Sequence, residues 1–132
     1  DEAYAAIAGT NPPKYHTRFD ALTDELLPPI QERLLQEHGF LVYAGAVDRN
    51  GYFPTHNRCF SQPLSGDYQR DLAGNRTKRV FADRVGLTCG SHTAPFKLQA
   101  YRRDTGELMF DLSVPIKLCG RHWGGFRIGY RA

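Results

Sequence analysis

Paired cysteines and metal-binding spacings are missing from this sequence of 132 residues. Cys59, Cys89 and Cys119 are an odd number of cysteines, and no C-x-x-C pair occurs. Because secreted domains held by disulfides normally have paired cysteines, isolated thiols favour a reducing compartment. No H-x-x-x-H, H-E-x-x-H or Cys/His spacing for zinc occurs either. We therefore expect structural or surface histidines and no metal site.

Long apolar runs and common catalytic motifs are also missing. No run approaches the roughly 18 apolar residues that a helix needs to span a bilayer, and the first residues are neither basic nor strongly apolar, unlike a signal peptide. G-x-S-x-G, P-loop and G-x-G-x-x-G motifs are absent. We expect a domain that is not an enzyme and has no catalytic residues. The absence of an initiator Met suggests a piece of a longer chain.

The composition that remains is typical of one globular domain. Hydrophobic residues make up 41% and charged residues 23% of the chain, a balance that argues against disorder. The formal charge of +3 is too small to imply nucleic-acid binding. Weak patterning up to residue 16 indicates a leader or linker at residues 1–16, and residues 17–132 are expected to form a single domain.

Hydrophobic periodicity predicts a helical lead-in followed by strands. Between Thr17 and Gly39 apolar residues recur at three- and four-residue spacing, with a kink or break expected at Pro28-Pro29. The Asn50-Gly51 pair between two apolar runs predicts a hairpin. Five segments are typical of strands: 40–47, 52–56, 96–103, 107–118 and 122–130. The long connection at 57–95 is expected to contain short helical turns and to be functional.

Alternation along the later strands separates an apolar face from a polar one. The apolar face is expected to pack on the N-terminal helix, and the opposite face carries Gln99, Tyr101, Asp111 and Ser113. That polar face either meets water, as in many antiparallel sheets, or is covered by the connection 57–95, which would enclose a polar pocket. The pattern leaves both alternatives open.

Six residues are candidates for ligand contacts in such a pocket. Arg76 and Arg79 are candidates for binding an anionic group, although a basic run is also typical of a solvated surface. Tyr101, Gln99 and His56 would supply hydrogen bonds. Trp123, beside Gly124 and Gly125, would form a wall, although close backbone approach or sheet packing explains these residues as well.

Five blocks of sequence resemble the PAS-like (Cache-like) sensory domain of bacterial methyl-accepting chemotaxis proteins. The blocks are Gly51–Asn57 (GYFPTHN), Asp71–Asp83 (DLAGNRTKRVFAD), Gln99–Glu107 (QAYRRDTGE), Asp111–Ile116 (DLSVPI) and Gly120–Tyr130 (GRHWGGFRIGY). The resemblance implies an α+β fold with a five-stranded antiparallel sheet in the order 2-1-5-4-3. It also implies that the N-terminal helix covers one face and that crossover helices enclose a ligand cavity on the other.

The function that the resemblance implies is sensing of a small polar or anionic molecule by a chemotaxis receptor. The expected partners are that ligand, the rest of the receptor chain with its chemotaxis signalling complex and, as an option, a second copy in a homodimer. A cytoplasmic position within a membrane-associated receptor is expected, with an extracytoplasmic sensor as the alternative.

Two other functions stay open at this point. The first is a redox or gas sensor with non-covalent haem or flavin, since some proteins of the family carry covalent haem and C-x-x-C-H is absent here. The second is a ligand-free interaction or dimerisation module, which would have a filled cavity with Arg76 bonded to Asp83 or Asp111. The leading expectation is a sensor without a cofactor.

Overall fold

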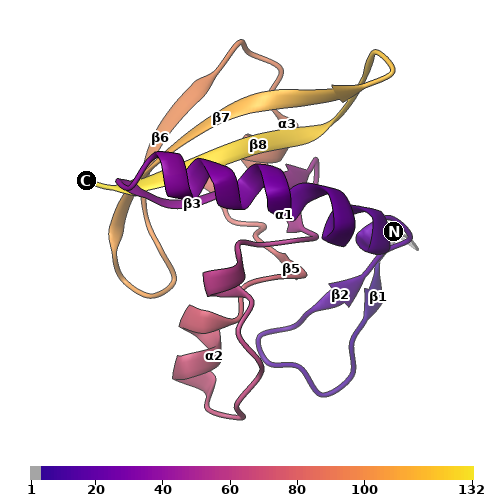
Figure 1. The fold of residues 1–132 in the computed structure, drawn as a ribbon, viewed down its shortest axis with the longest axis vertical. Helices are drawn as coiled ribbons and strands as arrows, with labels where there is room; N and C mark the ends of the chain where they lie inside the picture. The colour runs from indigo at the N-terminus through magenta and orange to yellow at the C-terminus, as the bar shows by residue number, and fades with distance from the viewer. Residues whose placement is uncertain (1–3) are drawn as a thin grey trace.

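The computed structural model describes residues 4–132, which contain helices, strands and three separate sheets (Figure 1). The helices are α1 (Asp20–Glu37), α2 (Tyr68–Gly74) and α3 (Arg84–Ser91), with a 3₁₀ turn at Arg58–Phe60. The strands are β1 (Ala5–Ala6), β2 (Tyr15–His16), β3 (Leu41–Asp48), β4 (Tyr52–Phe53), β5 (Arg79–Val80), β6 (Lys97–Arg102), β7 (Leu108–Leu118) and β8 (Arg121–Arg131).

The largest sheet is antiparallel, with four strands in the order β3-β8-β7-β6. β7 and β8 form its long central hairpin, which turns at Cys119 and Gly120, both with positive φ. β1 and β2 pair with each other within the segment that the sequence suggests as a leader. That small sheet is tied to the connection by a hydrogen bond from the Tyr15 backbone N–H to the Lys78 carbonyl.

The prediction of a five-stranded PAS-like sheet is wrong. β4, the strand expected beside β3, pairs instead with β5 in a separate two-stranded sheet. The outer edge of β3 is occupied by side chains: the Ala46 N–H donates to Gln31 Oε1 at 3.0 Å, and the Ala44 N–H donates to Asn57 Oδ1 at 2.9 Å. Because these backbone amides of β3 already donate to side chains, they cannot donate to the backbone of a fifth strand at this edge.

α1 runs as one helix of 18 residues through Pro28 and Pro29, so the expected break is not observed. It lies along β3 (Figure 1) and buries the amide of Gln31. Three apolar side chains of α1 remain at least 54% exposed: Leu22, Leu26 and Ile30. The expectation that the apolar stripe of this helix covers the apolar sheet face is therefore wrong.

α3 covers the polar face of the sheet. Cys89 of α3 donates to Asp111 of β7 at 2.7 Å, and Gln99 of β6 donates to the Val85 carbonyl of α3 at 3.3 Å. Gly125 of β8 allows this approach, since a Cβ there would collide with the carbonyl oxygen of Cys89. Of the two alternatives that the pattern left open for this face, the structure has α3, which is part of the connection 57–95, lying on it. A small core of Val47, Phe53, Val85 and Cys89 lies between the layers.

Candidate functional site

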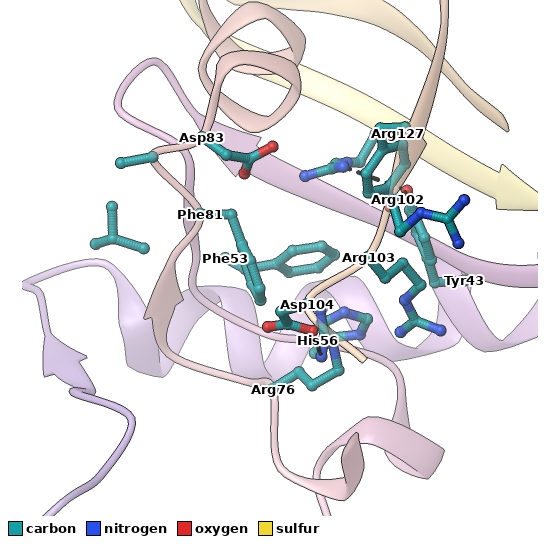
Figure 2. Close-up of a pocket in the computed structure, with 13 residues that line it drawn as sticks. Tyr43, Phe53, His56, Arg76, Phe81, Asp83, Arg102, Arg103, Asp104 and Arg127 are labelled. Carbon is teal, nitrogen blue, oxygen red and sulfur yellow. Dashed lines mark hydrogen bonds and ion pairs between the residues drawn. The ribbon is translucent and has the colours of Figure 1, made fainter. Parts of the chain in front are cut away.

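A cavity of about 360 Å³ lies between the polar face of the sheet and the connection (Figure 2). Tyr43 of β3, Tyr101 of β6 and Arg127 of β8 line it from the sheet. Arg76 and Phe81, on either side of β5, line it from the connection. We call this cavity the arginine pocket, because Arg76, Arg103 and Arg127 contribute their side chains to its wall.

Four guanidinium groups are buried at the pocket. Arg76, Arg103 and Arg127 line it, and Arg79 lies directly beside it; each of the four residues is at most 7% exposed. Burying a charged group is costly unless it is paired and hydrogen-bonded. The partners of these arginines therefore determine what the pocket can bind.

Asp104 binds two of the arginines at once. Its Oδ1 lies 2.7 Å from Arg76 Nη1, and its Oδ2 lies 2.9 Å from Arg79 Nη2. Although burial by itself raises the pKa of Asp104, these two guanidiniums lower it below its usual value. Both arginines also lie over the ring of Phe81, with Cζ 5.1 Å and 4.7 Å from its centroid, and both donate to the Leu72 carbonyl. Several contacts besides Asp104 thus hold these two side chains in place.

Arg127 is held by a buried network on the sheet. Asp111, fully buried, accepts from Arg127 Nε at 2.8 Å, from the Tyr43 hydroxyl at 2.5 Å and from the Cys89 thiol at 2.7 Å. Tyr43 also bonds to the Tyr101 hydroxyl at 2.6 Å. Burial raises the pKa of Cys89 to about 12 and raises that of Tyr43 well above its usual value, so both groups stay protonated donors at neutral pH.

Arg103 is the least satisfied of the four arginines. Its Nη1 lies 3.3 Å from Glu107 Oε1, a carboxylate that also contacts Arg131. Its buried Nε has no hydrogen-bond partner among the described residues. Burial, together with repulsion from Arg76, lowers the pKa of Arg103. Its Cζ lies over the ring of Phe60 and over that of Tyr43, 5.2 Å and 5.9 Å from their centroids. It can therefore offer a donor to a ligand.

His56 adds a neutral ring to the wall. It stacks on Phe53, with the ring centroids 3.9 Å apart and the planes at 11°. Burial, and then repulsion from Arg76 and Arg127, lowers its pKa well below the usual value. His56 Nδ1 accepts from the Asn57 N–H at 2.8 Å, so the neutral ring carries its proton on Nε2.

The structure brings together some of the residues singled out from the sequence and separates others. Arg76, His56 and Tyr101 line the pocket, and Arg79 lies beside it. Gln99 lies under α3, where it donates to the Val85 carbonyl. Trp123 packs against Phe19 of the N-terminal segment, with ring centroids 5.6 Å apart, and does not line the pocket.

Most residues that line the pocket were not predicted from the sequence, and the polar ones with the most contacts among them are Tyr43, Arg103, Asp104 and Arg127. The place of Arg127 could have been inferred from strand alternation. Gly125, Arg127 and Gly129 share one face of β8, and this is the face that α3 approaches. Alternation gives no such indication for Arg103 and Asp104, because they lie just after the end of β6, where the chain turns. The contacts proposed for a ligand-free module also differ, because Arg76 bonds to Asp104 rather than to Asp83 or Asp111.

Comparison of the chain with protein-family models, with curated proteins and with solved structures gave no match. Within residues 4–132, no group of three or more His, Cys, Asp or Glu side chains is arranged to hold a metal ion. None of the helices in that part of the chain is long and apolar enough to cross a membrane. The arrangement at the pocket therefore has to be interpreted from its own geometry, which is suited to holding an anion.

Proposed function

We propose that the chain is the ligand-binding sensory module of a bacterial chemotaxis receptor and that it takes a small organic anion in the arginine pocket. The observation that carries the proposal is the set of four buried guanidiniums around a cavity of about 360 Å³. That volume lies in the range of small-molecule sites. The assignment to a chemotaxis receptor depends on the five sequence blocks described above.

The balance of charge favours an anionic ligand. Three carboxylates bond directly to the four arginines: Asp104, Asp111 and Glu107. Asp83 also lines the pocket, but its carboxylate bonds to the Gly86 N–H and not to an arginine. Asp104 is shared by two arginines, and Glu107 is shared with Arg131. The pocket therefore holds cationic groups whose pairing is incomplete, and an anion that entered it would complete that pairing.

The aromatic side chains favour a ligand with a flat apolar body. Phe53, Phe81 and Tyr43 present ring surface to the cavity, and Arg103 and Arg127 lie beside the ring of Tyr43. A body that contacts these rings would be removed from water, while its anionic group meets a guanidinium. Benzoate is the simplest probe that combines the two features.

Signalling requires more than binding. The ligand must have different affinities for two states of the module, because only such a difference shifts their equilibrium. The change of state would be transmitted to the rest of the receptor chain and to its signalling complex. We propose a cytoplasmic position for the module.

The test is calorimetric titration of the protein with benzoate, acetate and the uncharged analogue benzamide. We expect benzoate to bind more tightly than acetate and benzamide not to bind. Arg103→Gln should weaken benzoate binding about tenfold or more, because it removes a charge-assisted donor from the pocket. The matched control is Arg131→Gln, which removes an exposed arginine bonded to the same Glu107 and should leave the affinity unchanged. Equal affinities for benzoate and benzamide would contradict the proposal.

A further inference from the structure

The carboxylate of Asp104 occupies the position that a ligand carboxylate would take. Its two oxygens are divided between Arg76 and Arg79, at 2.7 Å and 2.9 Å, which is the arrangement that a bound carboxylate makes with a pair of guanidiniums. In Figure 2, Asp104 lies beside Arg76 and near the rings of Phe53 and Phe81. The site for an acidic group is therefore formed and already filled from within the chain.

Asp104 belongs to a turn that is self-contained. The turn joins β6 to β7 and is closed by backbone hydrogen bonds from Arg103 N–H to the Glu107 carbonyl and from Gly106 N–H to the Arg103 carbonyl, both 2.8 Å long. Gly106 has a φ of +96°, which suits glycine in a tight turn. The carboxylate of Asp104 can leave the two arginines without breaking a strand pairing of the main sheet.

The three partners differ in exposure. About 33% of the Asp104 side chain is accessible, against 7% for Arg76 and 9% for Arg79. A released Asp104 would thus return to water at little cost, while both arginines stay held by the Leu72 carbonyl and by the ring of Phe81. The carboxylate-binding position therefore remains formed when its internal occupant departs.

We propose that Asp104 is a built-in competitor for the ligand: a carboxylate-bearing molecule displaces it from Arg76 and Arg79 and so detaches the β6–β7 turn from the connection. This inference rests on the proposed function and names both its ligand class, a carboxylate on a flat apolar body, and its conformational consequence. The competitor is tethered, so its effective concentration at the two arginines is high and ligand affinity is reduced accordingly. Removing the competitor raises the affinity.

The test compares two variants that each remove one carboxylate from the pocket. Asp104→Asn keeps the shape of the side chain and removes the charge that holds the arginines. Asp83→Asn is the matched control, because Asp83 also lines the pocket but bonds to the Gly86 N–H at the start of α3, a role that Asn also fills. Calorimetry with benzoate should give an affinity about tenfold or more higher for Asp104→Asn than for the wild type, and a change below about threefold for Asp83→Asn.

A second measurement needs no variant. Hydrogen exchange of the wild-type protein, with and without benzoate, should show faster exchange of amides in residues 103–107 when benzoate is bound, because the hydrogen bonds of a turn that is no longer anchored to the connection open more often. Inorganic phosphate serves as the comparison anion. If phosphate reproduces the full effect of benzoate on both affinity and exchange, the site takes any oxyanion and the carboxylate class is wrong.

The outcomes separate this inference from the proposed function. If the wild type binds benzoate through Arg103 but Asp104→Asn shows no gain and residues 103–107 become protected, the inference is wrong and the proposed function stands. If neither the wild type nor Asp104→Asn binds benzoate or acetate, both are wrong. An equal gain in Asp83→Asn and Asp104→Asn would mean that only the net charge matters, which also overturns the competitor.

Discussion

Two carboxylates hold arginines at opposite sides of the pocket, and they differ in how the chain supports them. Asp111 lies within β7, between two paired strands, and is fully buried where it bonds to Arg127. Asp104 lies on the turn after β6, with about a third of its side chain accessible, where it bonds to Arg76 and Arg79. An ion pair held by regular strands on both sides is part of the fold, whereas one carried by a turn is available for exchange.

The largest expected effect is on stability and comes from the buried carboxylate. Asp111→Ala leaves Arg127 as an uncompensated buried charge and removes the acceptor of Tyr43 and Cys89, so the free energy of unfolding should fall by about 3–5 kcal/mol. Asp104→Ala should cost less, roughly 1–2 kcal/mol, because Arg76 and Arg79 keep the Leu72 carbonyl and the ring of Phe81 as partners and water can enter the position that the carboxylate leaves at the pocket. Urea denaturation measures both variants. Equal losses of unfolding free energy in the two variants would show that Asp111 and Asp104 do not differ in their contribution to the fold.

An intermediate effect is expected from His56, a buried ring in the wall of the pocket. Burial keeps the folded-state pKa of His56 well below the usual value. Below about pH 6.5 the unfolded chain therefore binds a proton at His56, whereas the folded chain does not. Stability is then full above pH 6.5 and falls as the pH drops, by up to about 1.4 kcal/mol per pH unit. Denaturation at pH 7, 6 and 5 should show a shallower decline for His56→Gln than for the wild type.

The control for this pH dependence is His38→Gln, since His38 is exposed just after the end of α1. That variant should decline with falling pH as the wild type does. A decline in His56→Gln as steep as that of the wild type would show that His56 accepts a proton in the folded state.

The smallest expected effect compares the two tyrosines on the sheet side of the pocket. Tyr101→Phe removes one hydroxyl bond, to Tyr43, and should cost about 1 kcal/mol of unfolding free energy. Tyr43→Phe removes the hydroxyl that bonds to Asp111, Arg127 and Tyr101 together, and should cost clearly more. A larger loss from Tyr101→Phe would show that the network does not centre on Asp111.

The sequence allowed the central hairpin to be located, because alternation and turn residues mark its strands locally. The fifth strand could not be ruled out in this way, since Gln31 and Asn57 satisfy the edge of β3 from distant parts of the chain. Local pattern also could not show that the turn after β6 folds back onto the connection. For the same reason Arg76 was recognised as a candidate, while its partner Asp104 was not.

The central claim is that the arginine pocket binds a small organic anion, and a calorimetric titration of the wild-type chain with benzoate tests it most directly. We predict a saturable signal with one site per chain, weakened about tenfold or more by Arg103→Gln and unchanged by Arg131→Gln. The absence of any binding signal, or an affinity that Arg103→Gln leaves unchanged, would contradict it.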